Sequence, residues 1–271
     1  MQAPRALRVL LGLALLGLLL FPLVGERFYV QYAARIMIMA IFAMSLDLLV
    51  GYTGLVSLGH ALFYGIAGYA LVMASGGAAV SLWWSLPAAM LLSALAALAV
   101  GALVLRTSGI YFTMATLAIA QTAYFLVRDS KFFGGLDGYY LNASPLPRRY
   151  YLTLGIAAAT YVLLRTIVRS AFGRVLAGIR ENEPRMRSLG FPTLRYKLAC
   201  FVLAGALAGL AGCLSALQDG VVRPEQLGWQ RSAEALAMVI LGGRGTLAGP
   251  ALGAGAVMLL ELAFWGGAGH G

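Results

Sequence analysis

A few polar side chains interrupt apolar stretches of this chain, and their types suit contact with a polar solute. The first group follows a glycine-rich break that contains Gly51 and Gly54. On a continuous helix, Ser57, His60 and Tyr64 would lie within about 60° of one face. Polar groups inside apolar segments are costly, so each needs a partner or a polar path. A broken helix would turn its N-terminal amides towards such a path, whereas a tight connection between two helices would leave His60 bonded to a neighbouring carbonyl.

A second polar group recurs at helical spacing further along the chain. Thr113, Thr116, Gln121 and Tyr124 would share about 140° of a helix surface. Such a stripe can line a polar path, or it can hydrogen-bond to another helix. The candidate path residues are therefore Gly51, Gly54, Ser57, His60, Thr113, Thr116 and Gln121.

Asp47 is an acid just before the glycine break. It could complement the positive end of the helix that follows. An ion-coupled carrier would instead need it as part of an intramembrane ion site, and the sequence indicates no second acid nearby.

One dense block of charge lies between residues 165 and 197. Its members are Arg165, Arg169, Arg174, Arg180, Glu181, Glu183, Arg185, Arg187, Arg195 and Lys197. Apolar runs of membrane-spanning length flank the block, and loops rich in Lys and Arg stay on the cytoplasmic face. The block therefore predicts a cytosolic loop at about 169–197. Charge alone leaves two interpretations open, a docking surface for a partner or a solvated loop that sets orientation.

Composition identifies the medium in which the chain folds. Apolar residues make up 61% of the sequence and charged residues only 11%. That charged share is about half the usual value for soluble domains, so the sequence predicts a multi-pass membrane protein. The net charge of +10 could suggest nucleic acid. Because the cations cluster in one loop between spans, membrane lipid is the favoured partner and nucleic acid is not expected.

Apolar runs of about 17 to 25 residues predict the membrane-spanning helices. They lie at about 6–24, 36–51, 55–73, 82–105, 109–127, 150–168 and 198–217. A last apolar region, about 233–265, is interrupted at 242–246 by Gly-Gly-Arg-Gly-Thr, which predicts a short half-helix, a break and a longer helix. The expected fold is an all-α polytopic bundle of about eight helices, forming one integral membrane domain over residues 1–271.

The positions of proline and glycine within the charged block predict two short helices rather than an irregular loop. Pro184 favours the first turn of a helix and disfavours helical geometry at the residue before it, so a first helix should end near 181 or 182. A second helix should run from Pro184 to Leu189, with Gly190 as its left-handed cap and Pro192 preventing continuation. This pair would present Arg174, Arg180, Glu181 and Glu183 to a partner.

Five sequence blocks, in order, resemble the permease subunits of branched-chain amino acid ABC importers. The blocks are GYTGLVSLGHALFYG at 51–65, GIYFTMATLAIAQ at 109–121, GGLDG at 134–138, the stretch from GRVLAGIRENE at 173–183 through LGF at 189–191 to YKLACFVLAGALAGLAG at 196–212, and VILGGRGTLAGP at 239–250. Together they cover most of the chain after about residue 40. The family usually continues with another hydrophobic helix where this chain ends, so a terminal span is expected to be missing.

The resemblance implies a role for the charged block, because in that family the matching segment rests in a groove of the cytosolic ATPase. The residues that it assigns to ATPase coupling are Gly173, Arg174, Ile179, Arg180, Glu181, Asn182, Glu183 and Gly190. It also implies the partners: a second related permease subunit, cytosolic ABC ATPase subunits and an extracytoplasmic substrate-binding protein. The expected location is the bacterial inner membrane.

The chain itself lacks the motifs of an enzyme. It has no phosphate-binding loop, no four-ligand zinc pattern and no paired acids for hydrolysis, so we expect no cofactor here and ATP only on partner subunits. The expected function is import of a branched-chain or related amino acid. A permease for urea or a short amide remains an alternative, as does a self-sufficient channel or ion-coupled carrier.

Overall fold

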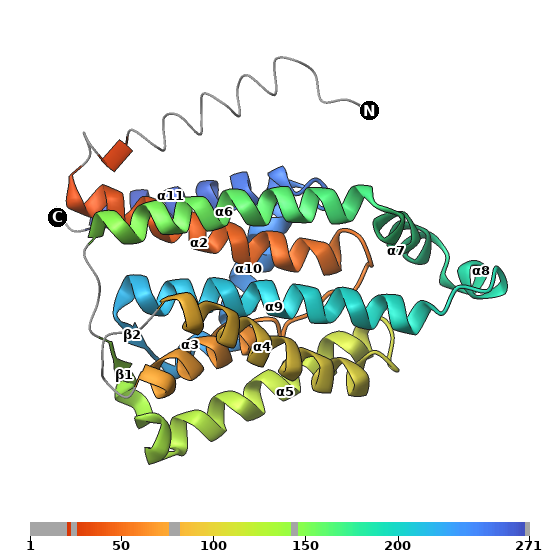
Figure 1. The fold of residues 1–271 in the computed structure, drawn as a ribbon, viewed down its shortest axis with the longest axis horizontal. Helices are drawn as coiled ribbons and strands as arrows, with labels where there is room; N and C mark the ends of the chain where they lie inside the picture. Colours follow the sequence, from red (N-terminus) through yellow and green to blue (C-terminus); the bar gives the residue numbers. More distant parts are fainter. Residues whose placement is uncertain (1–20, 23–25, 76–81, 142–145, 269–271) are drawn as a thin grey trace.

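The computed structural model describes residues 21–22, 26–75, 82–141 and 146–268 (Figure 1). Ten α-helices lie in this part of the chain. They are α2 (Arg27–Val50), α3 (Ala61–Ser75), α4 (Leu82–Val104), α5 (Ile110–Asp129), α6 (Leu146–Arg169), α7 (Ala171–Glu181), α8 (Glu183–Ser188), α9 (Thr193–Asp219), α10 (Trp229–Gly242) and α11 (Ala248–Ala268). The all-α prediction is confirmed.

Most of the predicted spans correspond to these helices. By length and composition, five helical segments can cross a membrane: 27–50, 84–104, 110–129, 149–169 and 193–219. Shorter apolar helices lie at 61–74 and 248–264. The predicted half-helix, break and longer helix are α10, residues 243–247 and α11. The span predicted at about 6–24 lies outside the described residues, apart from 21–22. The chain is a multi-pass membrane protein.

The centre of the bundle is formed by α2 and α9, which run antiparallel. Every residue of α2 from Met37 to Val50 is buried, as expected for a helix that is apolar on all sides. Small residues let α9 approach its neighbours closely. A Cβ at Gly209 would lie 2.2 Å from the hydroxyl of Ser93 in α4, and one at Gly212 would lie 1.9 Å from the carbonyl oxygen of Tyr64 in α3. The glycines are therefore packing residues.

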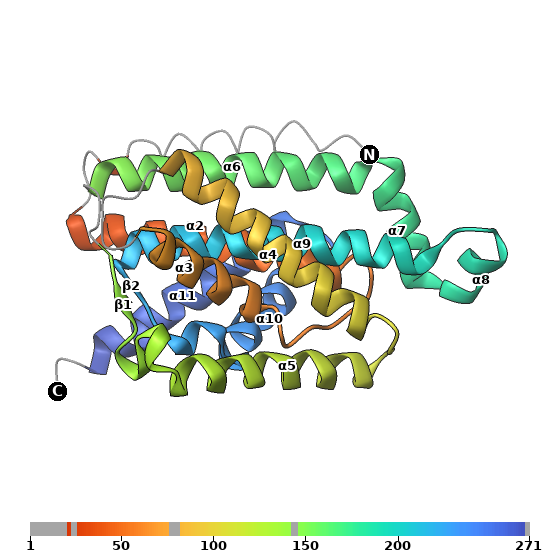
Figure 2. The same ribbon diagram turned by 60° about the horizontal axis from the view of Figure 1, so that its bottom comes forward.

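The two ends of the bundle are chemically different (Figures 1 and 2). At one end, α2, α4 and α6 finish, α5 and α9 begin, and α7 and α8 project beyond them. We call this the coupling end. Arg106, in the turn between α4 and α5, lies at the same end as the charged block, in agreement with the positive-inside rule. The opposite end, which we call the outer end, carries the start of α2 and the end of α9.

Residues 51–60 form an irregular segment between α2 and α3, which we call the interrupted segment. Helix α3 begins only at Ala61. The predicted helix at 55–73 is therefore wrong in its first part, and Ser57 does not share a helix face with Tyr64. Contacts from other helices hold this segment, so the spacing of its residues could not reveal its conformation.

A short antiparallel ribbon at the outer end was not predicted. Strand β1 (Tyr139–Tyr140) pairs with β2 (Val221–Val222), and the 3₁₀ turns η1 (Lys131–Phe133), η2 (Gly135–Asp137) and η3 (Pro224–Leu227) flank it. The GGLDG block makes this corner. Gly138 has φ +70°, and a Cβ there would lie 2.1 Å from the carbonyl oxygen of Val222, so no other residue fits without displacement.

Candidate functional site

The charged block folds into the two predicted short helices. Helix α7 ends at Glu181 and α8 begins at Glu183, with Asn182 between them. The side-chain oxygen of Asn182 accepts a hydrogen bond of 3.0 Å from the backbone N–H of Arg185, which caps α8. Gly190 has φ +88° and lies just beyond the end of α8, as predicted. The local signals of Pro184 and Gly190 were sufficient here, whereas the Asn182 cap was not predicted.

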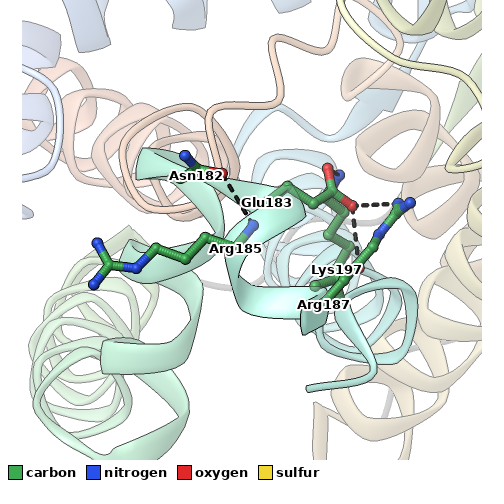
Figure 3. Close-up of polar contacts among 6 residues, drawn as sticks. Asn182, Glu183, Arg185, Arg187 and Lys197 are labelled. Carbon is green, nitrogen blue, oxygen red and sulfur yellow. Dashed lines mark hydrogen bonds and ion pairs between the residues drawn. The ribbon is translucent and has the colours of Figure 1, made fainter. Parts of the chain in front are cut away.

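Glu183 anchors α8 to the membrane part of the protein (Figure 3). Its carboxylate accepts a hydrogen bond of 2.7 Å from Arg187 and one of 3.1 Å from the hydroxyl of Thr193. It also accepts one from Lys197, a buried residue of α9. Partial burial by itself raises the pKa of this carboxyl, but the hydrogen bonds from Lys197 and Arg187 outweigh burial, and the pKa of Glu183 lies below its ordinary value.

One face of α7 is packed and determines how the helix leaves α6. Gly173, Leu176 and Ile179 are buried. A Cβ at Gly173 would lie 2.1 Å from the carbonyl oxygen of Val168, so the corner between α6 and α7 requires glycine. A Cβ at Gly178 would lie 2.9 Å from the sulfur of Met186 in α8, which shows how closely the two short helices pack.

The outward part of this region combines charged and apolar side chains. Arg174, Glu181 and Arg185 are exposed, and beside them Leu189 and Leu194 are 63% and 47% exposed. We call these five residues the docking surface. Leu189 follows α8 directly and Leu194 lies in the first turn of α9, so the exposed leucines lie beyond the helix pair along the chain.

Three of the four residues expected to face a partner make bonds within the chain. The guanidinium of Arg174 donates to the carbonyl oxygen of Arg169 at 3.1 Å. Glu183 binds Lys197, as described above, and the guanidinium of Arg180 donates a hydrogen bond to the carbonyl oxygen of Gly51. Arg180 therefore links α7 to the first residue of the interrupted segment. Nearby, a Cβ at Gly54 would lie 3.4 Å from Cγ of Arg180.

Next to Gly51, hydrogen bonds of Asp47 and Tyr52 join the end of α2 and the interrupted segment to the break between α10 and α11. The fully buried carboxylate of Asp47 accepts hydrogen bonds from the backbone N–H groups of Gly245 (2.7 Å) and Leu247 (3.4 Å). The hydroxyl of Tyr52 donates to the carbonyl oxygen of Gly245 at 2.7 Å. We call Asp47, Gly51, Tyr52, Arg180 and Gly245 the polar junction.

The junction is tightly built and locally strained. A Cβ at Gly51 would lie 2.4 Å from Oδ1 of Asp47 and 2.5 Å from the backbone nitrogen of Gly245. Leu247 has φ +57°, the one positive φ at a non-glycine residue in the described chain. Such a backbone conformation persists only where its surroundings enforce it, and it concentrates at functional sites. Asp47 complements the start of α11 rather than that of α3.

The interrupted segment and the first residue of α3 are held by polar contacts from three helices. The hydroxyl of Thr113 in α5 donates to the carbonyl oxygen of Val56 at 2.8 Å. The hydroxyl of Ser45 in α2 lies 2.9 Å from Nε2 of His60. The hydroxyl of Ser232 in α10 accepts from the first helical N–H of α3, at Ala61, at 2.8 Å. His60 therefore pairs with a hydroxyl rather than with a carbonyl.

Of the remaining candidate path residues, Thr116 packs on the interrupted segment, Ser57 lies within it and Gln121 lies further along α5. Thr116 is buried, and its carbonyl oxygen would be 2.3 Å from a Cβ at Gly59, so α5 packs directly on the segment. Ser57 is fully buried and accepts from the N–H of Gly59 at 3.3 Å. Gln121 lies further along α5, and within the described chain its buried Oε1 has no hydrogen-bond partner.

Sequence patterns did not identify several residues whose hydrogen bonds hold the interrupted segment, the start of α3 and the α10–α11 break. Ser45, Tyr52, Ser232 and Gly245 each make a bond described above, yet they come from α2, α10 and two breaks. The Gly-Gly-Arg-Gly-Thr interruption was the available signal for Gly245, because a break inside an apolar region places backbone polar groups where they need partners.

Comparison with known proteins identifies the family. Residues 28–269 match the family described as branched-chain amino acid transport system, permease component. The permease protein LivM of the high-affinity branched-chain amino acid transport system is similar to this chain in both Salmonella typhimurium LT2 and Escherichia coli K12. Each is 30% identical over 259 residues, covering 83% of this chain and 61% of the relative.

A second group of relatives is named for a different transport system. The autoinducer 2 import system permease protein LsrC of Enterobacter sp. strain 638 is 33% identical over 196 residues, covering 66% of this chain and 56% of the relative. No solved structure matches the chain. The chain thus spans about three fifths of the length of the LivM relatives. Because the family match extends over nearly the whole chain, this protein belongs to the permease component family of branched-chain amino acid transport systems.

Proposed function

We propose that this chain is the membrane permease subunit of an ABC importer for branched-chain or related amino acids. It would form part of the translocation path and couple to cytosolic ABC ATPase subunits, beside a second related permease subunit and an extracytoplasmic substrate-binding protein. The observation that carries the proposal is the bond from Arg180 of α7 to Gly51, because it connects a projecting helix pair to an interruption within the membrane bundle.

The geometry supports a route for coupling across the protein. An ATPase bound to the docking surface would move α7 and α8 when it binds ATP. Arg180 would pass that movement to Gly51, and Asp47 and Tyr52 would pass it to the α10–α11 break. Since packed elements are bistable rather than freely deformable, a small displacement at α7 can shift α3, α10 and α11 between two arrangements.

The relatives support the substrate class. Two LivM proteins are named for branched-chain amino acid transport, and they cover more of this chain than the LsrC relative does. The alternative of a self-sufficient ion-coupled carrier would require Asp47 for ions. Both carboxylate oxygens of Asp47 are hydrogen-bonded to the α10–α11 break, which favours a role in linking helices.

Co-purification tests the proposal. The chain is expressed with its chromosomal neighbours and purified in detergent, and ATPase activity is measured. We expect activity with wild type and loss of it with the docking-surface variant Glu181→Lys/Leu189→Asp. The control is Glu225→Lys, which repeats the Glu-to-Lys exchange at an exposed residue of η3, away from the docking surface. If wild type purifies without ATPase under conditions that keep it folded, the proposal is wrong.

A further inference from the structure

A cavity of about 340 Å³ lies towards the outer end of the bundle, between α2, α3, α9, α10 and α11. Its volume falls within the range of about 300–1,000 Å³ that is usual for small-molecule sites. Tyr64, which is fully buried, contributes from α3. The cavity is separate from the polar junction, yet α2, α10 and α11 reach both places.

Charges of both signs line this cavity. Arg35 and Arg231 provide two cations, and Asp219 and Glu261 provide two acids. Arg35 and Arg231 keep 53% and 38% of their side chains exposed and Glu261 is exposed, so a ligand can reach these charges. The apolar part of the lining includes Ile38, Met258 and Leu262.

The pairing of these charges divides them into two sets. Arg35 is bound to Asp219, with its Nη2 2.8 Å from a carboxylate oxygen, and the hydroxyl of Ser215 donates to the other oxygen at 3.1 Å. The charges of Arg35 and Asp219 are therefore paired with each other. Arg231 binds Glu234, outside the cavity lining, through Nη1 alone at 2.9 Å. Glu261 makes no ion pair with any residue in the described part of the chain.

We propose that the cavity is a binding site for a small zwitterion, an α-amino acid with an apolar side chain. Glu261 would accept the ammonium group, Arg231 would donate to the carboxylate, and Ile38, Met258 and Leu262 would contact the side chain. This inference rests on the proposed function and adds the site. A ligand that supplies one charge leaves either Glu261 without a partner or Arg231 with Glu234 alone, and a neutral amide such as urea leaves both groups as they are.

The position of the two binding residues connects the site to the coupling end. Arg231 is in the first turn of α10 and Glu261 is in the second half of α11. These are the helices whose shared break is bonded to Asp47, and the hydroxyl of Tyr32 in α2 also donates to the carbonyl oxygen of Met258. Movement of α10 relative to α11 would change the distance between Arg231 and Glu261 and hence the affinity for the ligand.

Ligand-induced stabilisation of the full chain in lipid nanodiscs tests the site. The probes are L-leucine, its amide (ammonium only), 4-methylpentanoate (carboxylate only) and urea. For wild type we expect L-leucine to raise the unfolding temperature, each single-charge probe to require at least about tenfold higher concentration, as for loss of one charged contact of about 1.4 kcal/mol or more, and urea to have no effect.

Charge-removing variants then assign each group. Glu261→Gln should abolish the preference for L-leucine over 4-methylpentanoate and keep the preference over the amide. Arg231→Gln should do the reverse. Asp129→Asn, which removes an exposed charge at the end of α5, is the control and should behave as wild type. A merely structural effect of either variant would weaken all probes equally, and that result would overturn the proposal, as would a wild type indifferent to L-leucine.

The outcome is independent of the ATPase test. If ATPase co-purifies but leucine binding does not depend on Glu261 and Arg231, the site is wrong and the importer assignment stands. If no ATPase accompanies the chain but the charge-specific pattern is found, the importer assignment fails and the site stands.

Discussion

The backbone N–H of Gly245 donates a hydrogen bond of 2.7 Å to the buried carboxylate of Asp47, and 198 positions separate the two residues. This bond joins the end of α2 to the α10–α11 break. A charge-assisted bond of this kind is stronger than one between neutral groups, and its loss would leave a buried N–H unsatisfied. Asp47 therefore determines the conformation of the break as well as its attachment.

Replacement of Asp47 should destabilise the chain according to what replaces it. Asp47→Ala leaves the N–H groups of Gly245 and Leu247 without an acceptor, and we expect a loss of about 1.5–3 kcal/mol in the free energy of unfolding. Asp47→Asn keeps one acceptor oxygen and should lose less. Unfolding of the purified variants in detergent measures both. Equal stability of wild type and Asp47→Ala would show that the bond has no structural role.

Arg180→Ala should separate docking from transport. The substitution leaves Glu181, Leu189 and the rest of the docking surface intact, so the ATPase should still co-purify. The link to Gly51 is lost, and substrate uptake by proteoliposomes of the assembled importer should fall by roughly 5- to 150-fold, the range of an ordinary coupling energy.

Arg174→Ala is the matched control for Arg180, because Arg174 belongs to the same helix and is exposed. Its guanidinium bonds to the carbonyl oxygen of Arg169 at the end of α6 rather than to the interrupted segment. Because Arg174 belongs to the docking surface, Arg174→Ala should weaken ATPase co-purification, which Arg180→Ala leaves unchanged, whereas uptake per bound ATPase should change little. Similar losses with both variants would mean that α7 acts only through its total charge.

The conformation of α7 and α8 was predictable because its signals are local. Pro184, Gly190 and Pro192 each act on backbone within a few residues. The interrupted segment was predicted poorly, because bonds from Thr113 and Ser45 in other helices hold it and Ser232 bonds to the first N–H of α3 beyond it. No spacing rule relates Asp47 to Gly245 or Arg231 to Glu261 either. The sequence indicated the breaks at 51–54 and 242–246, and tertiary packing decided what each break contacts.

Gly51→Ala tests how closely the junction is packed. The new Cβ would lie 2.4 Å from Oδ1 of Asp47 and 2.5 Å from the nitrogen of Gly245, so one of them must move. We expect a destabilisation of about 1–3 kcal/mol, the usual cost of overpacking. Gly155→Ala in α6 is the control, because nothing lies within 4 Å of its Cβ. The control should match wild type or gain up to about 1 kcal/mol from helix propensity.

Glu183 should make the attachment of α8 sensitive to acid. Because hydrogen bonds from Lys197 and Arg187 outweigh partial burial and hold its pKa below the unfolded value of 4.5, the carboxylate contributes stability that is fully present above that pH. The contribution is lost as the pH falls through the lowered pKa of the folded state. Relative to the intrinsic exchange rate at each pH, hydrogen exchange of the amides in α8 and the first turn of α9 should therefore accelerate as the pH falls below 4.5. In Glu183→Gln the exchange should be faster at neutral pH and should change less on acidification. Acid-induced opening of equal size in wild type and variant would assign the effect to another group.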